Sequence, residues 1–470
     1  MRYHIWTLGC QMNVADSQLL ASKLENMGHH AATDPDEADI LVVNTCVVRQ
    51  SAEDKAYGRL RELAHLKAQQ PEKIVGLMGC LVGGRDPLRL REKLPQVDVF
   101  LPPSDPGPMV EFLQARDTER DVIALDAAAR NIRERLQDGI SDAAAAGLIV
   151  LPEHERGHLV SAHVPVVYGC SHACAFCIIP YRRGVEKSRP VGEIVAHVRS
   201  LARQGVKEIT LLGQIVDRYG KDVPDGPNLA QLLRVVHDVA EEEDVYRLRF
   251  LTSHPNWMTD ELLDTVAELP RVMPQIEVPV QAGNDAVLER MRRGYTADQY
   301  RALVANIRAR IPNVAIHNDI IVGFCGETDE QFMDTYRLLE ELKLDKVHLA
   351  RYSPRPHTVS QRTMADDVPH EEKKRRHALL EELQARIVAE INAPYLGQTV
   401  EVLVEDQHKG KWRGRTPQNK LVFFADDSQD WRGRLAQVEI TWTGPWSMQA
   451  RLPGQPESGQ PDVIPLRVTG

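Results

Sequence analysis

Apolar and polar residues alternate along the first hundred positions in a way that predicts strands and helices in turn. Short apolar runs, typical of buried parallel strands, are followed by longer segments with one apolar helical face. The predicted strands are 4–8, 40–43, 74–78 and 97–101, and the predicted helices are 16–27 and 51–69. This order predicts an α/β domain with a doubly wound parallel sheet over residues 1–115.

A second alternating series begins near residue 159 and is longer. Its predicted strands are 164–167, 208–212, 248–251, 275–280, 315–322 and 346–352. Its predicted helices are 192–203, 229–242, 260–268, 286–293 with 297–310, and 330–342. Six βα units are fewer than the eight of a closed TIM barrel, so we expect a partial (βα)6 barrel within residues 156–391.

The end of the chain has a different pattern. After a charged helix predicted at 370–391, short alternating strands separated by Gly, Pro and Asp turns are predicted at 399–404, 420–424, 436–440 and 448–452. They predict a small antiparallel β-barrel over residues 392–465. The polar, weakly periodic residues 116–155 are predicted to be a linker.

Composition limits the classes of function. With 43% hydrophobic and 26% charged residues, the chain resembles an ordinary globular protein. A net charge of -10 means that any nucleic acid has to be bound by local basic patches. We find no apolar run of about 18 residues and no signal-peptide pattern at the start of the sequence. We therefore expect a cytoplasmic protein without a membrane span.

Three of the seven cysteines lie in one short loop after a predicted strand. Cys170, Cys174 and Cys177 have the spacing Cys-x3-Cys-x2-Cys, between Gly169 and Pro180. Thiolates this close together are typical of a metal site. Structural zinc normally has four protein ligands, and we read His172 as a turn residue. Three thiolates on an iron–sulfur cluster leave one iron open, which favours the cluster over the zinc alternative.

Three further cysteines each follow a predicted strand of the first domain. Cys10, Cys46 and Cys80 are spread over 70 positions, but the carboxyl ends of parallel strands share one edge of a sheet. We therefore expect these three thiols to converge on a second metal site. The alternative is that they are small buried apolar residues, as free cysteines usually are.

The C-terminal region contains a basic segment. Residues 407–425 contain five Lys or Arg residues, with Trp412 among them, and no Asp or Glu. The candidates for RNA binding are Lys409, Lys411, Trp412, Arg413, Arg415 and Lys420. Basic residues interleaved with an aromatic ring suit an RNA backbone and its bases. The alternative is a solvated hairpin tip.

The cysteine loop, with Phe176 before Cys177, resembles the cluster motif of radical S-adenosylmethionine enzymes. The rest of the chain resembles one of their families, the methylthiotransferases, with a TRAM-type RNA-binding barrel at the end. The matching stretches are 7–13, 44–46 with Arg49, 79–80, 178–184, 188–190, 212–214, 252–255, 279–281, 291–296, 319–324, 326–328 and 352–355. Residues 11–13, 252–255, 293–296 and 352–355 are most similar to the members that act on isopentenyladenosine in tRNA.

The resemblance implies two [4Fe-4S] clusters. Cys170, Cys174 and Cys177 are expected to hold the cluster that cleaves S-adenosylmethionine, and Cys10, Cys46 and Cys80 an auxiliary cluster that carries the sulfur. The implied reaction adds a methylthio group at C2 of N6-isopentenyladenosine at position 37 of tRNA, beside the anticodon. It uses two S-adenosylmethionine molecules per product.

Further expectations follow from the same resemblance. The candidate S-adenosylmethionine contacts are Ser188, Gln214, Gln281, Gly323 and Phe324. The candidates for holding RNA phosphate or the cofactor carboxylate, with surface solvation as the alternative, are Arg182, Arg183, Arg292 and Arg293. The implied partners are the anticodon stem-loop of tRNA, an electron donor such as flavodoxin or ferredoxin, and a sulfur donor. We expect a monomer that does not bind membranes.

The chain departs from the family pattern at a few positions. Cys325 replaces the usual proline and is read as an inert thiol, while Glu277, Ile215 and His357 also differ from the common residues. The rival functions are methylthiotransfer to threonylcarbamoyl-adenosine in tRNA or to an aspartate of a ribosomal protein. A rival of another class is a non-catalytic, metal-containing RNA-binding protein.

Overall fold

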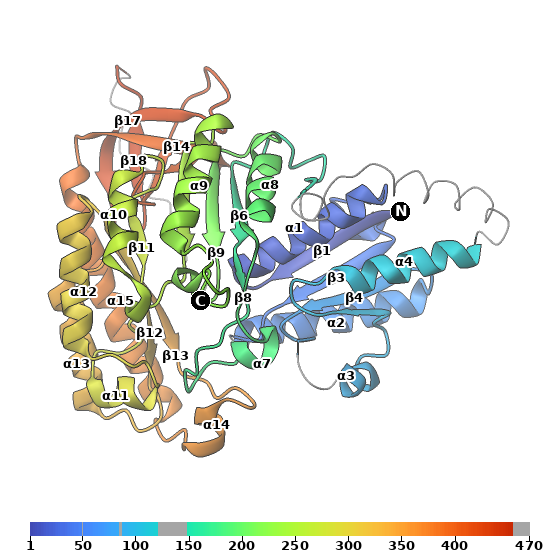
Figure 1. Ribbon diagram of the computed structural model, residues 1–470, viewed down its shortest axis with the longest axis horizontal. Helices are drawn as coiled ribbons and strands as arrows, with labels where there is room; N and C mark the ends of the chain where they lie inside the picture. Colours follow the sequence, from blue (N-terminus) through green and yellow to red (C-terminus); the bar gives the residue numbers. More distant parts are fainter. Residues whose placement is uncertain (49, 84–86, 121–147, 455–470) are drawn as a thin grey trace.

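The computed structural model describes residues 1–48, 50–83, 87–120 and 148–454 of the chain. Most of the predicted linker, 121–147, lies outside the described residues, as do Arg49 and the segment after 454. Figure 1 shows three units, with the N-terminal domain beside a central barrel and a small C-terminal barrel at one end of it. The domain boundaries expected from the sequence stay predictions.

The N-terminal domain is a five-stranded parallel sheet in the order β2-β1-β3-β4-β5. The strands are β1 (Arg2–Leu8), β2 (His30–Ala31), β3 (Ile40–Thr45), β4 (Ile74–Gly79) and β5 (Val99–Leu101). The helices are α1 (Gln11–Asn26), η1 (Pro35–Glu37), α2 (Gln50–Gln69), α3 (Pro87–Lys93) and α4 (Gly107–Arg120). Apolar residues of α1 and α4 pack on one face and those of α2 on the other, so the sheet is doubly wound as predicted.

The central domain contains the six parallel strands predicted from the sequence. They are β6 (Ser161–Pro165), β9 (Glu208–Leu212), β10 (Arg247–Leu251), β11 (Gln275–Glu277), β12 (Ala315–Val322) and β13 (Lys346–Arg351). Two three-stranded sheets, β10-β9-β6 and β11-β12-β13, adjoin where β10 contacts β11. The fold is therefore a partial (βα)6 barrel, which confirms the predicted class.

Helices and one short ribbon complete the central domain. The helices and turns are α7 (Ile179–Arg183), α8 (Val191–Ala202), η2 (Val216–Arg218), α9 (Leu229–Glu242), η3 (Pro255–Trp257), α10 (Asp260–Glu268), α11 (Asp285–Arg290), α12 (Ala297–Arg310), α13 (Asp329–Leu342), α14 (Val359–Thr363) and α15 (His370–Asn392). The predicted first strand is broken near Val166, and β7 (Val167–Tyr168) turns away to pair with β8 (Lys187–Ser188). This ribbon closes the base of the Cys170 loop.

The C-terminal unit is a closed barrel that follows a short turn, η4 (Ala393–Tyr395). Its strands are β14 (Thr399–His408), β15 (Lys411–Arg415), β16 (Leu421–Phe424), β17 (Leu435–Thr443) and β18 (Met448–Arg451), in the order β14-β15-β16-β18-β17. Two details differ from prediction: β15 is a strand that was not among the predicted ones, and β16 pairs with β18 in parallel. β15 forms by pairing antiparallel with β14 in a hairpin. Its own sequence is highly charged and gives little indication of a strand.

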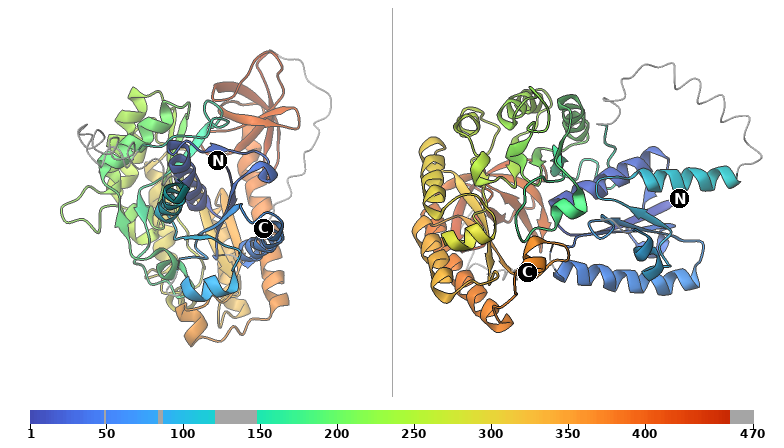
Figure 2. Two further views of the ribbon diagram at one scale, coloured as in Figure 1. Left: turned by 90° about the vertical axis from the view of Figure 1, so that its right-hand side faces the viewer. Right: turned by 60° about the horizontal axis from the view of Figure 1, so that its bottom comes forward.

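The C-terminal barrel packs against the amino ends of the central strands. Arg249 is 3% exposed and binds Glu208 and Gln275 within the central barrel, each at 2.9 Å. The same guanidinium donates to the carbonyl oxygens of Thr416 (3.1 Å) and Pro417 (2.9 Å) in the C-terminal barrel. The carboxyl ends of the strands, with α7, α11 and α14, lie at the opposite end (Figures 1 and 2). Within the described residues, no helix is long and apolar enough to cross a membrane.

We expect Arg249→Ala to destabilise the contact between the central and C-terminal barrels. The substitution removes the ion-pair partner of the buried Glu208 carboxylate and the donor to two carbonyls. Loss of the partner of a buried charge costs about 3–5 kcal/mol. Urea unfolding and the rate of proteolytic release of the C-terminal barrel measure the effect. Arg234→Ala, which breaks an exposed pair with Glu268, is the control and should change the unfolding free energy by less than about 1 kcal/mol. Equal effects of the two variants would contradict this role.

Candidate metal centres at the strand ends

Backbone contacts hold the Cys170 loop in one conformation. Gly169 has φ of +65°, and a Cβ there would lie 2.1 Å from the carbonyl oxygen of Val185, so no other residue fits. The Cys170 amide donates to the Gly184 carbonyl at 3.0 Å, and the Ala175 amide donates to the Met291 carbonyl at 3.0 Å. The loop is thus held to the β8 side and to the end of α11, with its three thiols on the strand-end edge.

The thiols of this loop are in an environment that opposes their negative charge. Burial raises the pKa of Cys170 to about 11. Burial, and then repulsion from the neighbouring thiolates, raises the pKa of Cys177 to about 12. Metal ligation requires all three as thiolates, so this donor set fits a strongly cationic centre that repays the burial of charge. Soft thiolate ligands with no carboxylate among them suit iron–sulfur or zinc.

The second set of cysteines converges as the sequence predicted. Cys10, Cys46 and Cys80 lie within two residues of the ends of β1, β3 and β4. The Cys46 thiol donates to Cys10, which lowers the pKa of Cys10 to about 6 and raises that of Cys46. Burial raises the pKa of Cys80, and the negative charge of Cys10 raises it further. The close approach of the Cys10 and Cys46 segments depends on Gly9, because a Cβ on Gly9 would lie 2.7 Å from the Cys46 Cβ.

Hydrogen bonds between two buried asparagine side chains hold the segments that carry Cys10 and Cys46 together. Asn13 and Asn44 are fully buried, and the Asn13 amide donates to the Asn44 side chain (2.8 Å) and the Thr45 carbonyl (2.9 Å). Asn44 donates back to the Asn13 carbonyl at 2.8 Å. The Asn13 oxygen lies 3.2 Å from the Cys10 sulfur. The first turn of α1 and the last residues of β3 are therefore held to each other next to the thiols.

Within the described ranges, one group of at least three His, Cys, Asp or Glu side chains has ligand atoms that all lie within 4.8 Å of one another, and it consists of His237, Asp238 and Glu241.

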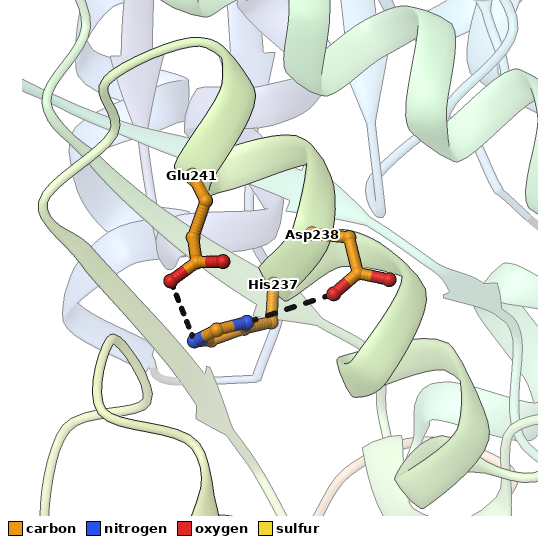
Figure 3. Close-up of side chains that lie close together, drawn as sticks. All are labelled: His237, Asp238 and Glu241. Carbon is orange, nitrogen blue, oxygen red and sulfur yellow. Dashed lines mark ion pairs between the residues drawn. The ribbon is translucent and has the colours of Figure 1, made fainter.

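In the group of His237, Asp238 and Glu241, the histidine ring lies between the two carboxylates. Its ring nitrogens face different carboxylates, with Nδ1 3.8 Å from Asp238 and Nε2 4.0 Å from Glu241 (Figure 3). A metal on either nitrogen would leave the other carboxylate on the far edge of the ring. Both carboxylates are exposed on α9, and Glu241 also faces Arg271. This group carries no metal assignment.

One buried arginine connects the central domain to the second cysteine set. Arg183, at the end of α7, pairs with Asp16 of α1 at 2.9 Å, and both side chains are at most 3% exposed. It also donates to Ser104, whose hydroxyl donates to Asp16 at 2.6 Å. Burial opposes the charge of Arg183, but Asp16, Cys80 and Cys10 together raise its pKa. Arg183 is therefore neither solvated nor open to RNA phosphate.

The other predicted arginines have different environments. Arg182 donates to the Gly83 carbonyl at 2.8 Å, and Arg292 is exposed. Arg293 is 5% exposed and donates to the Cys174 sulfur at 3.2 Å. His172 also approaches that sulfur, with Nδ1 at 3.2 Å. His172, predicted to be a turn residue, and Arg293, a candidate for binding phosphate, are thus both hydrogen-bond partners of Cys174.

The predicted S-adenosylmethionine contacts all lie on the strand-end edge. The Ser188 hydroxyl is already bonded to Asp222 at 2.5 Å and to the Gly220 amide at 2.8 Å. Gln214 follows β9, and Gln281 has φ of +76° beside β12. The Gly323 amide donates to Glu327 at 2.6 Å. Phe324 is fully buried and packs edge-on against Phe176 of the cysteine loop, so its role is to support that loop.

The basic residues of the C-terminal barrel are less free than predicted. Trp412 is 5% exposed, and its indole donates to the Asp426 carbonyl at 2.8 Å. It therefore belongs to the barrel core, and the prediction of an aromatic ring on the surface is wrong. Lys420 pairs with Asp345 at 2.9 Å. The rest lie along the β14–β15 hairpin: Lys409, Lys411, Arg413 and Arg415.

The sequence did not assign a role to the loop after β10, which faces the Cys170 loop. His254 lies 4.6 Å from His172 between ring centroids. Burial, with Arg293 nearby, lowers the pKa of His254 to about 2, so the ring is neutral. Its Nδ1 accepts from the Asn256 amide at 3.3 Å, which leaves the hydrogen on Nε2, a buried donor without a protein partner in the described structure. The resemblance at 252–255 was the signal that could have identified it.

Comparisons with known proteins agree with this geometry. Residues 164–339 match the radical SAM superfamily, residues 2–102 the "Uncharacterized protein family UPF0004", and residues 394–452 the TRAM domain. The chain is 50% identical over 455 residues to the tRNA-2-methylthio-N(6)-dimethylallyladenosine synthase of Roseiflexus sp., covering 96% of this chain and 89% of that one. It is 46% identical to the protein of the same name from Chloroflexus aurantiacus, covering 95% and 91%.

A solved structure shares the fold at low sequence identity. The radical S-adenosylmethionine methyltransferase TsrM of Kitasatospora setae has a TM-score of 0.54 and 15% identity, over 77% of this chain and 76% of that one. Fold, cysteine loop and superfamily match together define a radical S-adenosylmethionine enzyme. Within that superfamily the chain belongs to the methylthiotransferase family, so it is a transferase. Membership of the superfamily implies S-adenosylmethionine and one [4Fe-4S] cluster as cofactors.

We expect Asp16→Asn to weaken the contact between the N-terminal and central domains. The change keeps the side-chain shape but removes the carboxylate charge that pairs with the buried Arg183 guanidinium, at a cost of about 3 kcal/mol. Anaerobic urea unfolding measures the loss. Glu62→Gln, which breaks an exposed pair with Arg59, is the control and should cost less than about 1 kcal/mol. An Asp16 variant as stable as the control would show that the pair does not join the domains.

Proposed function

We propose that this chain is a tRNA methylthiotransferase that adds a methylthio group at C2 of N6-isopentenyladenosine at position 37. The observation that carries the proposal is the pair of separate three-cysteine sets, one on each of two adjoining sheets. The full-length relatives named tRNA-2-methylthio-N(6)-dimethylallyladenosine synthase support the substrate. One set is sufficient to cleave S-adenosylmethionine, and the second suits the transfer of sulfur.

The first set serves the radical-generating cofactor. Cys170, Cys174 and Cys177 would hold a [4Fe-4S] cluster, and three cysteine ligands would leave one iron for S-adenosylmethionine. When bound, the cluster and S-adenosylmethionine supply the radical chemistry. His172 and Arg293 donate hydrogen bonds to Cys174, and the apolar wall of Ile179 and Ile215 excludes water. The strand-end residues Ser188, Gln214, Gln281 and Gly323 lie where the rest of S-adenosylmethionine would be bound.

The second set serves an auxiliary [4Fe-4S] cluster. Cys10, Cys46 and Cys80 would hold it, and three cysteine ligands would leave one iron for the sulfur to be transferred. Arg183 places a permanent positive charge beside Cys80 and Cys10. The Asn13–Asn44 network keeps the start of α1, beside Cys10, from separating from the end of β3, beside Cys46. Two S-adenosylmethionine molecules are used per product, one as methyl donor and one as radical source.

The partners follow from this chemistry. The C-terminal barrel binds the tRNA through Lys409, Lys411, Arg413 and Arg415, which lie on one hairpin. A one-electron donor of the flavodoxin or ferredoxin class reduces the first cluster. A separate sulfur donor restores the auxiliary site after each turnover. The enzyme acts as a monomer in the cytoplasm.

Nucleoside analysis tests the substrate. We expect tRNA from cells that lack this gene to contain N6-isopentenyladenosine without its 2-methylthio derivative, and the gene to restore the derivative. Loss of the methylthio group from threonylcarbamoyl-adenosine would support the first rival. An unmodified ribosomal-protein aspartate would support the second. Unchanged 2-methylthio-isopentenyladenosine would sink the proposal.

Two cysteine variants separate the roles of the two sets. We expect Cys174→Ala to abolish reductive cleavage of S-adenosylmethionine to 5′-deoxyadenosine, because it removes a ligand of the first cluster. Cys46→Ala should keep cleavage but stop methylthiolation. Wild-type protein purified without oxygen should hold about eight irons per chain, and each variant about four. Zinc in place of iron, or cleavage lost in both variants, contradicts the assignment of two independent clusters.

A further inference from the structure

Arg293 is a buried cation whose hydrogen-bond partners include no carboxylate in the described part of the chain. Its Nε donates to the Tyr295 hydroxyl at 2.8 Å, and Nη2 donates to the Pro279 carbonyl at 3.0 Å. Its Nη1 donates to the Cys174 sulfur at 3.2 Å. A guanidinium taken out of water needs an anion. The Cys174 thiolate is the acceptor in this set that can supply the negative charge.

The position of the guanidinium is fixed by its neighbours. The Tyr295 hydroxyl donates to the Val280 carbonyl at 2.9 Å, so it accepts from Arg293 and cannot rotate away without losing that bond. The Arg293 amide donates to the Leu288 carbonyl at 3.0 Å, which anchors the backbone to α11. The contact with Cys174 is therefore a built feature of the fold.

The three thiols of the loop differ in what they accept. The Cys170 sulfur accepts from the backbone amide of His172 at 3.4 Å. Among these thiols, Cys174 is the one for which the described contacts include side-chain donors, His172 and Arg293. Hydrogen bonds and positive charge at a ligand sulfur are among the factors that set the reduction potential of an iron–sulfur cluster. The side-chain hydrogen bonds described for this loop are therefore concentrated on the Cys174 sulfur.

We propose that Arg293 is a positioning residue that raises the reduction potential of the cluster held by Cys170, Cys174 and Cys177. The inference rests on the proposed assignment of these three ligands. Reduction adds one electron, taken from a one-electron donor protein, and no bond in the chain forms or breaks. The guanidinium stabilises the added negative charge through the Cys174 sulfur, so the reduced state is favoured. This makes the reduction that precedes cleavage of S-adenosylmethionine easier.

Redox titration of anaerobic holoprotein, followed by EPR, tests the role. The signal to follow is the one that Cys174→Ala lacks. We expect Arg293→Gln to keep its iron and this signal, but to shift the reduction equilibrium about tenfold toward the oxidised cluster, or about 59 mV more negative for one electron. Arg293→Lys keeps a charge but loses the planar fork that donates to Cys174, so it should shift the midpoint in the same direction by a smaller but measurable amount. Arg292→Gln, which removes a neighbouring exposed charge, should leave the potential unchanged.

The outcomes are distinguishable. An Arg293→Gln protein with full iron and an unchanged midpoint would overturn the proposal and leave a purely structural role. If the Gln variant loses its iron, the midpoint of the Lys variant decides, and an unchanged value overturns the proposal. If Cys174→Ala retains every signal of the wild type, the ligand assignment itself is wrong, whatever Arg293 does.

Discussion

The burial of thiolate charge is the constraint on which both cysteine sites depend. Burial raises the pKa of Cys170 and Cys177 well above the ordinary value for a thiol, and the same effect acts on Cys80. One buried guanidinium lies beside the thiols at each site and opposes this effect with its positive charge: Arg293 at the first site and Arg183 at the second. Gly169 and Gly9 permit close backbone approaches beside the thiols, and the Asn13–Asn44 amides hold α1 to β3 next to the second set.

Much of this arrangement is predictable from the sequence because it follows from strand order. Continuous apolar runs identify the buried parallel strands, and parallel strands place their following loops on one edge. Cys10, Cys46 and Cys80 could therefore be brought together without coordinates. Trp412 was misplaced because no strand was predicted at Lys411 to Arg415 and its ring was grouped with the basic residues as a candidate for RNA binding. As a strand, this segment directs alternate side chains to opposite faces, and Trp412 then points inward.

The roles of the arginines could not be predicted in the same way. The contact of Arg293 with Cys174 spans 119 residues, and that of Arg183 with Asp16 spans 167. Neither follows from a periodic pattern, since each depends on the path of a loop and on one long side chain. A basic residue in the sequence looks the same whether it faces solvent or a buried sulfur. Only tertiary structure separates the two cases.

The position of the C-terminal barrel sets a minimum size for a substrate that uses both ends of the enzyme. That barrel rests on the amino ends of the central strands, whereas the cysteine loops lie at the carboxyl ends. The eight residues of β12 alone span about 26 Å at about 3.3 Å per residue. A free nucleoside can occupy one end only. A folded RNA can bridge both, and its second contact then forms at a high effective concentration, so recognition works by avidity.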